Sequence, residues 1–144
     1  MSRSDDDDVI SRILETCRTI AVVGLSADPA RDSHEVAHYL QSHGYRIVPI
    51  NPAYAGSSIL GERCYATLYD AAAELSKEGT HIDLVDCFRR PDAIEAIAEA
   101  AIAIDAQCLW MQLGVVNEAA AAKARAAGIA VVMDRCLKIE HAYR

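Results

Sequence analysis

The sequence has few aromatic residues and no long uninterrupted hydrophobic run. Aromatic side chains make up 6% of the 144 residues, so the core must be built from aliphatic side chains. No stretch approaches the roughly 18 consecutive apolar residues that a membrane-spanning helix needs. The opening residues also lack the basic and then apolar regions of a signal peptide. We therefore expect a cytoplasmic protein without a membrane partner.

Paired cysteines and catalytic motifs are absent as well. The five cysteines are scattered and form no Cys-x-x-Cys pair, which is typical of reduced core thiols rather than of disulfides or a zinc site. The histidines offer one helical pair, His34 and His38, without a predicted third ligand, so no metal site is expected. There is no Gly-x-Ser-x-Gly elbow, and the sequence offers no catalytic set.

Positive charge is scarce. The chain has 14 Lys and Arg against 21 Asp and Glu, and the net charge of −7 disfavours nucleic acids and anionic membranes as main partners. More than half of the acidic excess is one run of four aspartates at residues 5–8. We expect residues 1–18 to hold an acidic leading helix over 8–18, because acids stabilise the positive end of a helix.

Strand-like and helix-like segments alternate along most of the chain. Predicted strands are the short apolar runs at 20–23, 46–50, 82–88, 107–113 and 129–133. Predicted helices lie at 33–43, 91–104 and 117–127, with a further one near 69–77 in an otherwise irregular segment, 53–80. Strands that are apolar throughout are buried on both faces, which requires helices on both sides of a parallel sheet. The sequence predicts one α/β domain over residues 1–144, with a Rossmann-like, open, doubly wound and mostly parallel sheet.

The loop after the first strand, residues 24–33, is the most informative segment. In a doubly wound sheet, ligands lie beyond the carboxyl ends of the strands, with a phosphate over the first helix N-terminus. The loop has neither the Gly-x-Gly-x-x-Gly spacing of dinucleotide sites nor the Gly-Lys-Ser/Thr of a Walker loop. It does offer Gly24 for close backbone approach, two serine hydroxyls (Ser26 and Ser33) and the positive charge of Arg31. A phosphate-bearing ligand is one interpretation.

The second interpretation of this loop is purely structural. Asp32 or Ser33 would cap the helix, and Glu35, three residues after Asp32, would complete a capping box. Capping and phosphate binding are compatible with each other.

The end of the second strand argues against a nicotinamide cofactor. NAD-binding proteins usually carry an acid there that bonds the ribose, whereas this chain has Asn51-Pro52. Without that carboxylate, a 3′-phosphorylated ribose is tolerated, which is a property of coenzyme A. A buried structural turn is the alternative for Asn51-Pro52.

The end of the third long strand brings further positive charge. Phe88-Arg89-Arg90 follows the apolar run there, so two arginines are expected at the same crevice as Arg31. The alternative is that one or both pair with local acids such as Asp92.

Gln112 ends the next predicted strand and offers an amide contact to a ligand. Its neighbours Trp110, Met111 and Leu113 are most simply explained as core residues.

Several blocks of the sequence together carry a resemblance. They are Val23-Gly24-Leu25-Ser26 with Pro29-x-Arg31-x-Ser33, residues 44–52, Val85-Asp86-Cys87-Phe88-Arg89, residues 110–115, and residues 132–136 with Glu140. In this order and spacing the chain resembles the small stand-alone CoA-binding domain family, which is similar to the Rossmann-type domain of the succinyl-CoA synthetase α subunit.

The resemblance implies a set of cofactor-binding residues for coenzyme A. The phosphates would lie at the first loop, the adenosine end near the second strand end, and the third strand end would line the crevice. The candidate residues are Gly24, Leu25, Ser26, Pro29, Arg31, Ser33, Asn51, Pro52, Phe88, Arg89, Arg90 and Gln112.

Two kinds of function stay open. The first is a module that binds CoA or an acyl-CoA, without chemistry of its own, as a carrier, sensor or regulator. The second is an enzyme acting on CoA thioesters, or using another nucleotide such as NAD, with Cys87, Cys136 or a partner subunit supplying the reactive group. Ligase activity is not expected, because the chain is too short to hold the synthetase's ligase domain. A homodimer and an unidentified protein partner are both compatible with the sequence.

Overall fold

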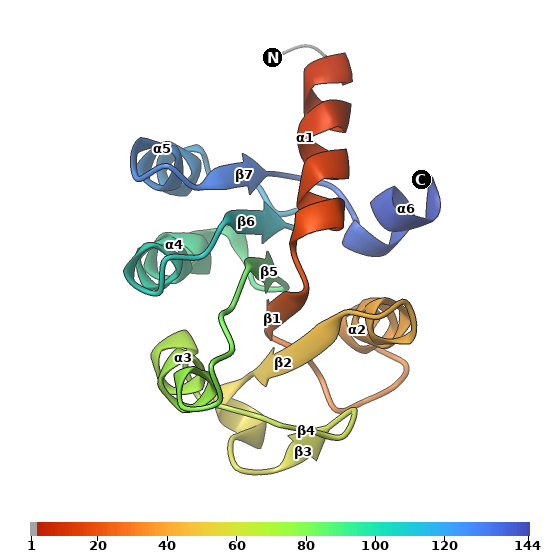
Figure 1. Cartoon of the computed structure of the whole chain (residues 1–144), viewed down its shortest axis with the longest axis vertical. Coiled ribbons are helices and arrows are strands. Elements are labelled where there is room, and N and C mark those ends of the chain that lie inside the picture. Colours follow the sequence, from red (N-terminus) through yellow and green to blue (C-terminus); the bar gives the residue numbers. More distant parts are fainter. Residues whose placement is uncertain (1–2) are drawn as a thin grey trace.

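A five-stranded parallel sheet forms the centre of the computed structural model, which describes residues 3–144 and side chains from Asp6 onward (Figure 1). Its strands are β1 (Thr19–Val23), β2 (Arg46–Ile50), β5 (Leu84–Cys87), β6 (Cys108–Met111) and β7 (Ala130–Val132). Their spatial order is β2-β1-β5-β6-β7, and each neighbouring pair is parallel. The predicted Rossmann-like α/β fold is therefore confirmed.

Helices cover both faces of the sheet (Figure 1). One face carries α3 (Leu68–Ser76), α4 (Ile94–Ala103) and α5 (Glu118–Ala126), and the other carries α1 (Arg3–Thr16), α2 (Asp32–Ser42) and α6 (Leu137–Ala142). Short 3-10 turns, η1 (Pro52–Tyr54) and η2 (Pro91–Ala93), follow β2 and precede α4. No helix of the described residues has the length and apolar character that crossing a membrane requires.

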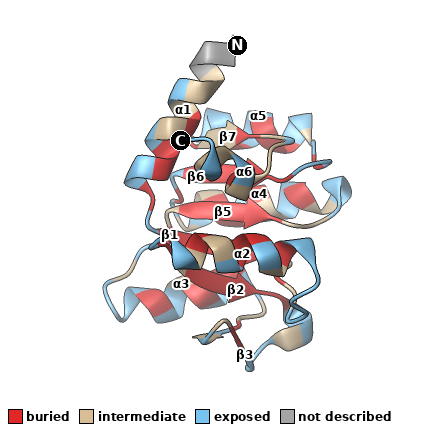
Figure 2. Cartoon of the chain, turned by 90° about the vertical axis from the view of Figure 1, so that its right-hand side faces the viewer, coloured by how far each residue is buried: buried red, intermediate tan, exposed pale blue. Residues whose placement is uncertain are grey.

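The continuous apolar strands are explained by burial on both faces, as Figure 2 shows for the sheet. In β1, Ala21 and Val23 pack in the cluster under α3, α4 and α5, while Ile20 and Val22 pack under α1, α2 and α6. Every residue of β1, β5 and β6 is buried. The sheet therefore separates two aliphatic cores.

The irregular segment after β2 contains a small hairpin that the sequence did not predict. Its strands, β3 (Ser58–Ile59) and β4 (Glu62–Arg63), have two residues each. Beyond β4, Tyr65 pairs with the outer edge of β2, donating its N–H to the Pro49 carbonyl (3.0 Å) and accepting the Asn51 N–H (2.9 Å). The hairpin is thereby held against the side of the sheet.

The leading helix is longer than expected, since α1 begins at Arg3 instead of residue 8. Residues 1 and 2, and the side chain of Asp5, lie outside the described part. Asp6 contacts Arg135 (3.8 Å) and Asp7 contacts Arg144 (3.4 Å), so cations near the other end of the chain offset part of the acidic run. Helix α6, which the sequence analysis did not predict, begins two residues after Arg135.

The strand order reverses between β1 and β5, and this is where doubly wound sheets bind ligands. Gly24, just after β1, has φ +92°, and a Cβ there would lie 2.3 Å from the Phe88 carbonyl oxygen. Glycine is the residue that fits this crossing of two backbone segments. The close approach seen here is that of the Phe88 backbone, and the approach of a ligand to Gly24 stays a prediction.

Candidate functional site

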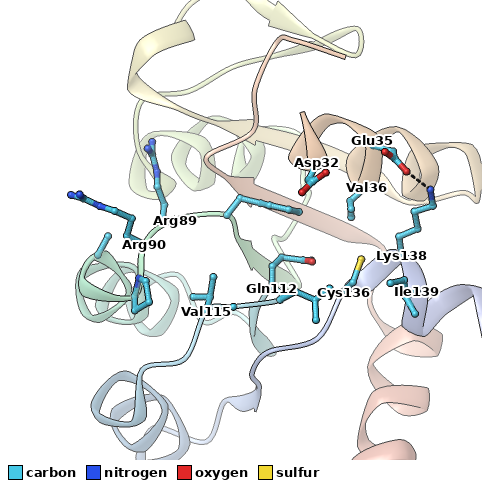
Figure 3. A pocket seen from close by; sticks show the side chains of 15 residues that line it. Asp32, Glu35, Val36, Arg89, Arg90, Gln112, Val115, Cys136, Lys138 and Ile139 are labelled. Carbon is cyan, nitrogen blue, oxygen red and sulfur yellow. Dashed lines mark hydrogen bonds and ion pairs between the residues drawn. The ribbon is translucent and has the colours of Figure 1, made fainter. Parts of the chain in front are cut away.

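Two adjoining cavities run along the carboxyl edge of the sheet. The smaller, of about 630 Å³, is lined by the first loop, the start of α2 and the residues after β2; we call it the loop cavity. The larger, of about 1130 Å³, lies between α2, the end of β6 and α6; we call it the α6 cavity (Figure 3). Asp32, Phe88 and Arg89 line both, so the two cavities adjoin at the strand reversal.

The first loop is folded by its own side chains. The Ser33 hydroxyl accepts the Ser26 N–H, and the Ser26 hydroxyl accepts the Asp28 N–H, both at 3.0 Å. Asp28 in turn accepts the Ala30 N–H at 2.9 Å. Each serine still has a hydroxyl proton to donate, and both line the loop cavity. The loop is thus preorganised around a set of hydrogen-bond donors.

Helix α2 starts beside these serines without a side-chain cap. Its N-cap residue, Arg31, is extended and makes no capping bond, whereas Thr67 and Asn117 cap α3 and α5. The capping box of the structural interpretation is not formed, because Ser33 bonds the loop and Glu35 pairs with Lys138. The first turn of α2 therefore presents uncapped N–H groups to the cavity, next to the exposed carboxylate of Asp32.

The three arginines predicted at the crevice do not all line the same cavity. Arg31 lines the loop cavity, Arg90 lines the α6 cavity, and Arg89 lines both. Arg90 lies 3.7 Å from Asp92, and because both side chains are largely exposed this pairing is weak. Among the described residues no ion pair involves Arg31 or Arg89. Their charge is available to an anion in the cleft.

Asn51 has the structural role that the sequence left as an alternative. Its Nδ2 donates to the Leu25 carbonyl (3.1 Å) and its Oδ1 accepts the Ala53 N–H (3.0 Å), so the buried amide ties the first loop to the end of β2. Asn51 also lines the loop cavity, while Leu25, Pro29 and Pro52 line neither cavity. The side chain of Leu25 belongs to the core.

A buried polar pair lies at the floor of the α6 cavity. Gln112 lines this cavity and donates its Nε2–H to Asp86 Oδ1 at 2.7 Å. Asp86 is fully buried, and its Oδ2 has no hydrogen-bond partner. Burial raises the pKa of Asp86 to about 7, against the opposing effect of the Gln112 hydrogen bond. The sequence analysis missed Asp86, although an acid within an apolar strand was its signal.

Leu113 corrects a second expectation around Gln112. Trp110 and Met111 are fully buried, as expected, but Leu113 is 61% exposed and lines the α6 cavity. The strand ends at Met111, and the chain turns outward through Leu113 and Gly114.

The two cysteines singled out by the sequence have different surroundings. Cys87 is fully buried, and burial, with a smaller effect from Asp86, raises the pKa of its thiol well above the usual value. It lines neither cavity, which opposes a role as nucleophile. Cys136 is half-buried and lines the α6 cavity close to Gln112 (Figure 3). Within residues 3–144 no group of three or more His, Cys, Asp or Glu is placed to hold a metal ion.

Comparisons with known proteins agree with this arrangement. Residues 18–142 match the family model described as "CoA binding domain". The uncharacterized protein YneT of Bacillus subtilis (strain 168) is 38% identical over 133 residues, which is 92% of each chain. Among solved structures, a Thermus thermophilus protein, cell-free ID.343, superposes with a TM-score of 0.86 at 34% identity, over 95% of this chain and 97% of its own. A hypothetical protein from Pyrococcus horikoshii OT3 gives 0.85 at 36% identity, over 95% and 90%.

Proposed function

Because this chain belongs to the CoA-binding domain family, we propose that it binds coenzyme A in the cleft at the carboxyl edge of its sheet, as a module without chemistry of its own. The observation that carries the proposal is the loop cavity. It brings together an uncapped helix start, two serine hydroxyls and two arginines that make no ion pair within the described part of the chain. They lie beside Gly24, where a side chain would clash with the Phe88 carbonyl.

The phosphates fit this place for electrostatic reasons. The first-turn N–H groups of α2 and the hydroxyls of Ser26 and Ser33 can donate to phosphate oxygens, as helix N-termini in Rossmann-like folds do. Arg31 and Arg89 add positive charge at the same cavity. A chain with a net charge of −7 thus gathers positive charge locally, where one small, phosphate-rich ligand can use it.

The adenosine end of the ligand fits the other side of the loop cavity. Asn51 is an amide rather than an acid, so a 3′-phosphate on the ribose meets no carboxylate there. Tyr54, in η1, is half-buried and lines this part of the cavity, where its ring can cover an adenine face. The sequence analysis passed over Tyr54, whose signal was an aromatic residue three positions after Asn51.

An enzyme acting on CoA thioesters is the second candidate, because the Cys136 side chain lines the α6 cavity. With the purified protein and a panel of acyl-CoAs, we expect no release of free CoA thiol. Turnover that Cys136→Ser abolishes would replace the binding proposal with the enzymatic one.

A comparison of three ligands tests the binding proposal directly. Native mass spectrometry of freshly purified protein is expected to show the mass increment of a CoA, and calorimetry with added CoA to show one site. Dephospho-CoA should bind about tenfold more weakly, since it lacks one charged group that accepts hydrogen bonds, and NAD should bind more weakly still. Binding of NAD as tight as that of CoA, or no binding of CoA, would overturn the proposal.

A further inference from the structure

The α6 cavity is larger than the loop cavity, and its lining is chemically different. Apart from the residues shared with the loop cavity, its walls are largely apolar. They include Val36, Pro91, Leu113, Val115, Cys136 and Ile139. A diphosphate and an adenosine need a polar cavity, so the proposed CoA site leaves the α6 cavity without an assigned ligand group.

The two cavities meet at Phe88 and Arg89, which line both. A ligand whose phosphates lie at the start of α2 therefore extends past these residues into the α6 cavity with its other end. In coenzyme A that other end is the thiol-bearing arm, and whatever is joined to the thiol lies farthest from the phosphates.

Apolar side chains at the rim of the α6 cavity are left uncovered. Leu113, after β6, is 61% exposed, and Ile139, on α6, is 49% exposed, in a chain where most large aliphatic side chains are buried. Val36 and Val115 lie deeper in the same cavity and are almost fully buried. An apolar ligand group among these four side chains would remove the exposed surface of Leu113 and Ile139 from water.

The polar groups of the cavity have defined orientations. The Nε2–H of Gln112 is held by buried Asp86, so its Oε1 is directed into the cavity, where it can accept an N–H from an amide-containing arm (Figure 3). On the opposite side, Lys138 pairs with Glu35 at 2.6 Å, so these two charges offset each other beside the apolar side chains. The cavity therefore fits an amide arm that ends in an uncharged apolar group.

We propose that the α6 cavity is an acyl site, and that the ligand of this protein is a CoA thioester with an apolar acyl group rather than free CoA. This inference rests on the proposed function, because binding of the phosphates in the loop cavity is what directs the acyl end of the ligand into the α6 cavity. The acyl chain lies between Val36 and Val115 at the bottom and Leu113 and Ile139 at the rim, and Gln112 orients the arm.

A chain-length series measures this preference. Isothermal calorimetry would compare free CoA with acetyl-, butyryl- and hexanoyl-CoA. Full burial of one methylene corresponds to about fourfold in Kd, so in this open cavity we expect Kd to fall by about two- to fourfold per methylene. Adipoyl-CoA, which is as long as hexanoyl-CoA but ends in a carboxylate, should bind at least about tenfold more weakly than hexanoyl-CoA.

Two rim substitutions locate the acyl chain. Leu113→Asp and Ile139→Asp place a charge at exposed positions of the cavity and are expected to flatten the chain-length dependence. Tyr69→Asp is the matched control, because Tyr69 is 53% exposed, lies on α3 and lines neither cavity. This variant should keep the wild-type series.

The outcomes separate the two proposals. If CoA binds but Kd stays constant from acetyl to hexanoyl, or if adipoyl-CoA binds as well as hexanoyl-CoA, the acyl site is wrong and the CoA site stands. If Ile139→Asp and Leu113→Asp keep the wild-type dependence, the acyl chain lies elsewhere. If no CoA compound binds, both proposals fail.

Discussion

The loop cavity and the α6 cavity share three residues but are built in different ways. The loop cavity is formed largely by neighbours in sequence, since Ser26, Asp28 and Ser33 bond one another within a single turn of chain. The α6 cavity is assembled from elements far apart, and Glu35 meets Lys138 across 103 positions. The first is shaped by the hydrogen bonds of one loop, whereas the second is a side-chain surface whose shape depends on tertiary packing.

Gly24→Ala should break the loop cavity and cause the largest effect. The new Cβ would lie 2.3 Å from the Phe88 carbonyl oxygen, at a φ of +92° that other residues rarely adopt. We expect the free energy of unfolding, from urea titration, to fall by about 3 kcal/mol or more. Gly56→Ala is the control, because it has φ +88° but no atom within 4 Å, and should lose only about 1 kcal/mol. Equal losses of unfolding free energy in the two variants would mean that the close contact between Gly24 and Phe88 does not contribute to stability.

Asp86→Asn tests the buried carboxyl at the α6 cavity through the pH dependence of stability. Since burial raises the pKa of Asp86 to about 7 in the folded state, the folded protein holds a proton that the unfolded chain releases near pH 4. Stability therefore falls as pH rises, by about 2.5 kcal/mol between pH 5 and 8, and is constant above the folded pKa. The variant should lack this loss.

Urea titrations of both proteins at several pH values check the Asp86 prediction. His141 acts in the opposite direction, because burial and then His43 lower its pKa, but it is present in both proteins and cancels in their difference. A wild-type loss that persists in the variant would assign the titration to another group.

Arg89→Ala tests the junction of the two cavities. Arg89 lines both and makes no ion pair among the described residues, so removing it should weaken CoA binding by about 1.5–3 kcal/mol if it bonds a phosphate. Arg31→Ala, at the loop cavity only, should give a smaller loss within the same range. The control is Arg12→Ala, because the Arg12 side chain is exposed on α1 and lines neither cavity. In calorimetry this variant should bind CoA like the wild type. If all three variants match the wild type, the phosphates lie elsewhere.

Asp32→Asn should produce the smallest change, and in the opposite direction. Asp32 lies at the start of α2 and lines both cavities, so its negative charge opposes a nearby phosphate. Because the side chain is exposed, we expect only about two- to threefold tighter CoA binding at low salt, fading as ionic strength rises. A gain that does not depend on salt would point to a contact rather than to charge.

The difference between the cavities also explains what the sequence could predict. The strands were predicted because burial on two faces leaves continuous apolar runs, and the loop because its bonds join residues within ten positions. An acid in an apolar strand was a local signal for Asp86, but its partner Gln112 lies 26 positions away and no local pattern indicates the pairing. Leu113 was expected in the core because an apolar residue at a cavity rim looks the same in sequence as a buried one.

The unpredicted elements are short. Strands β3 and β4 have two residues each, too few for a period, and α6 has six residues and no side-chain cap. Their places are fixed by tertiary contacts, such as the bond between the Tyr39 hydroxyl on α2 and His141 Nδ1 on α6. The wall of the α6 cavity could therefore not be derived from the sequence, although the strand ends beside it could.

The hairpin after β2 affects how the sheet meets other molecules. An open edge strand is a template for pairing with another chain, and long parallel sheets are exposed to this form of aggregation. Here Tyr65 occupies the outer backbone groups of Pro49 and Asn51, and Pro49 itself has no N–H to offer. At the far edge, β7 is only three residues long. The sheet is thus protected at both margins against growth by strand addition.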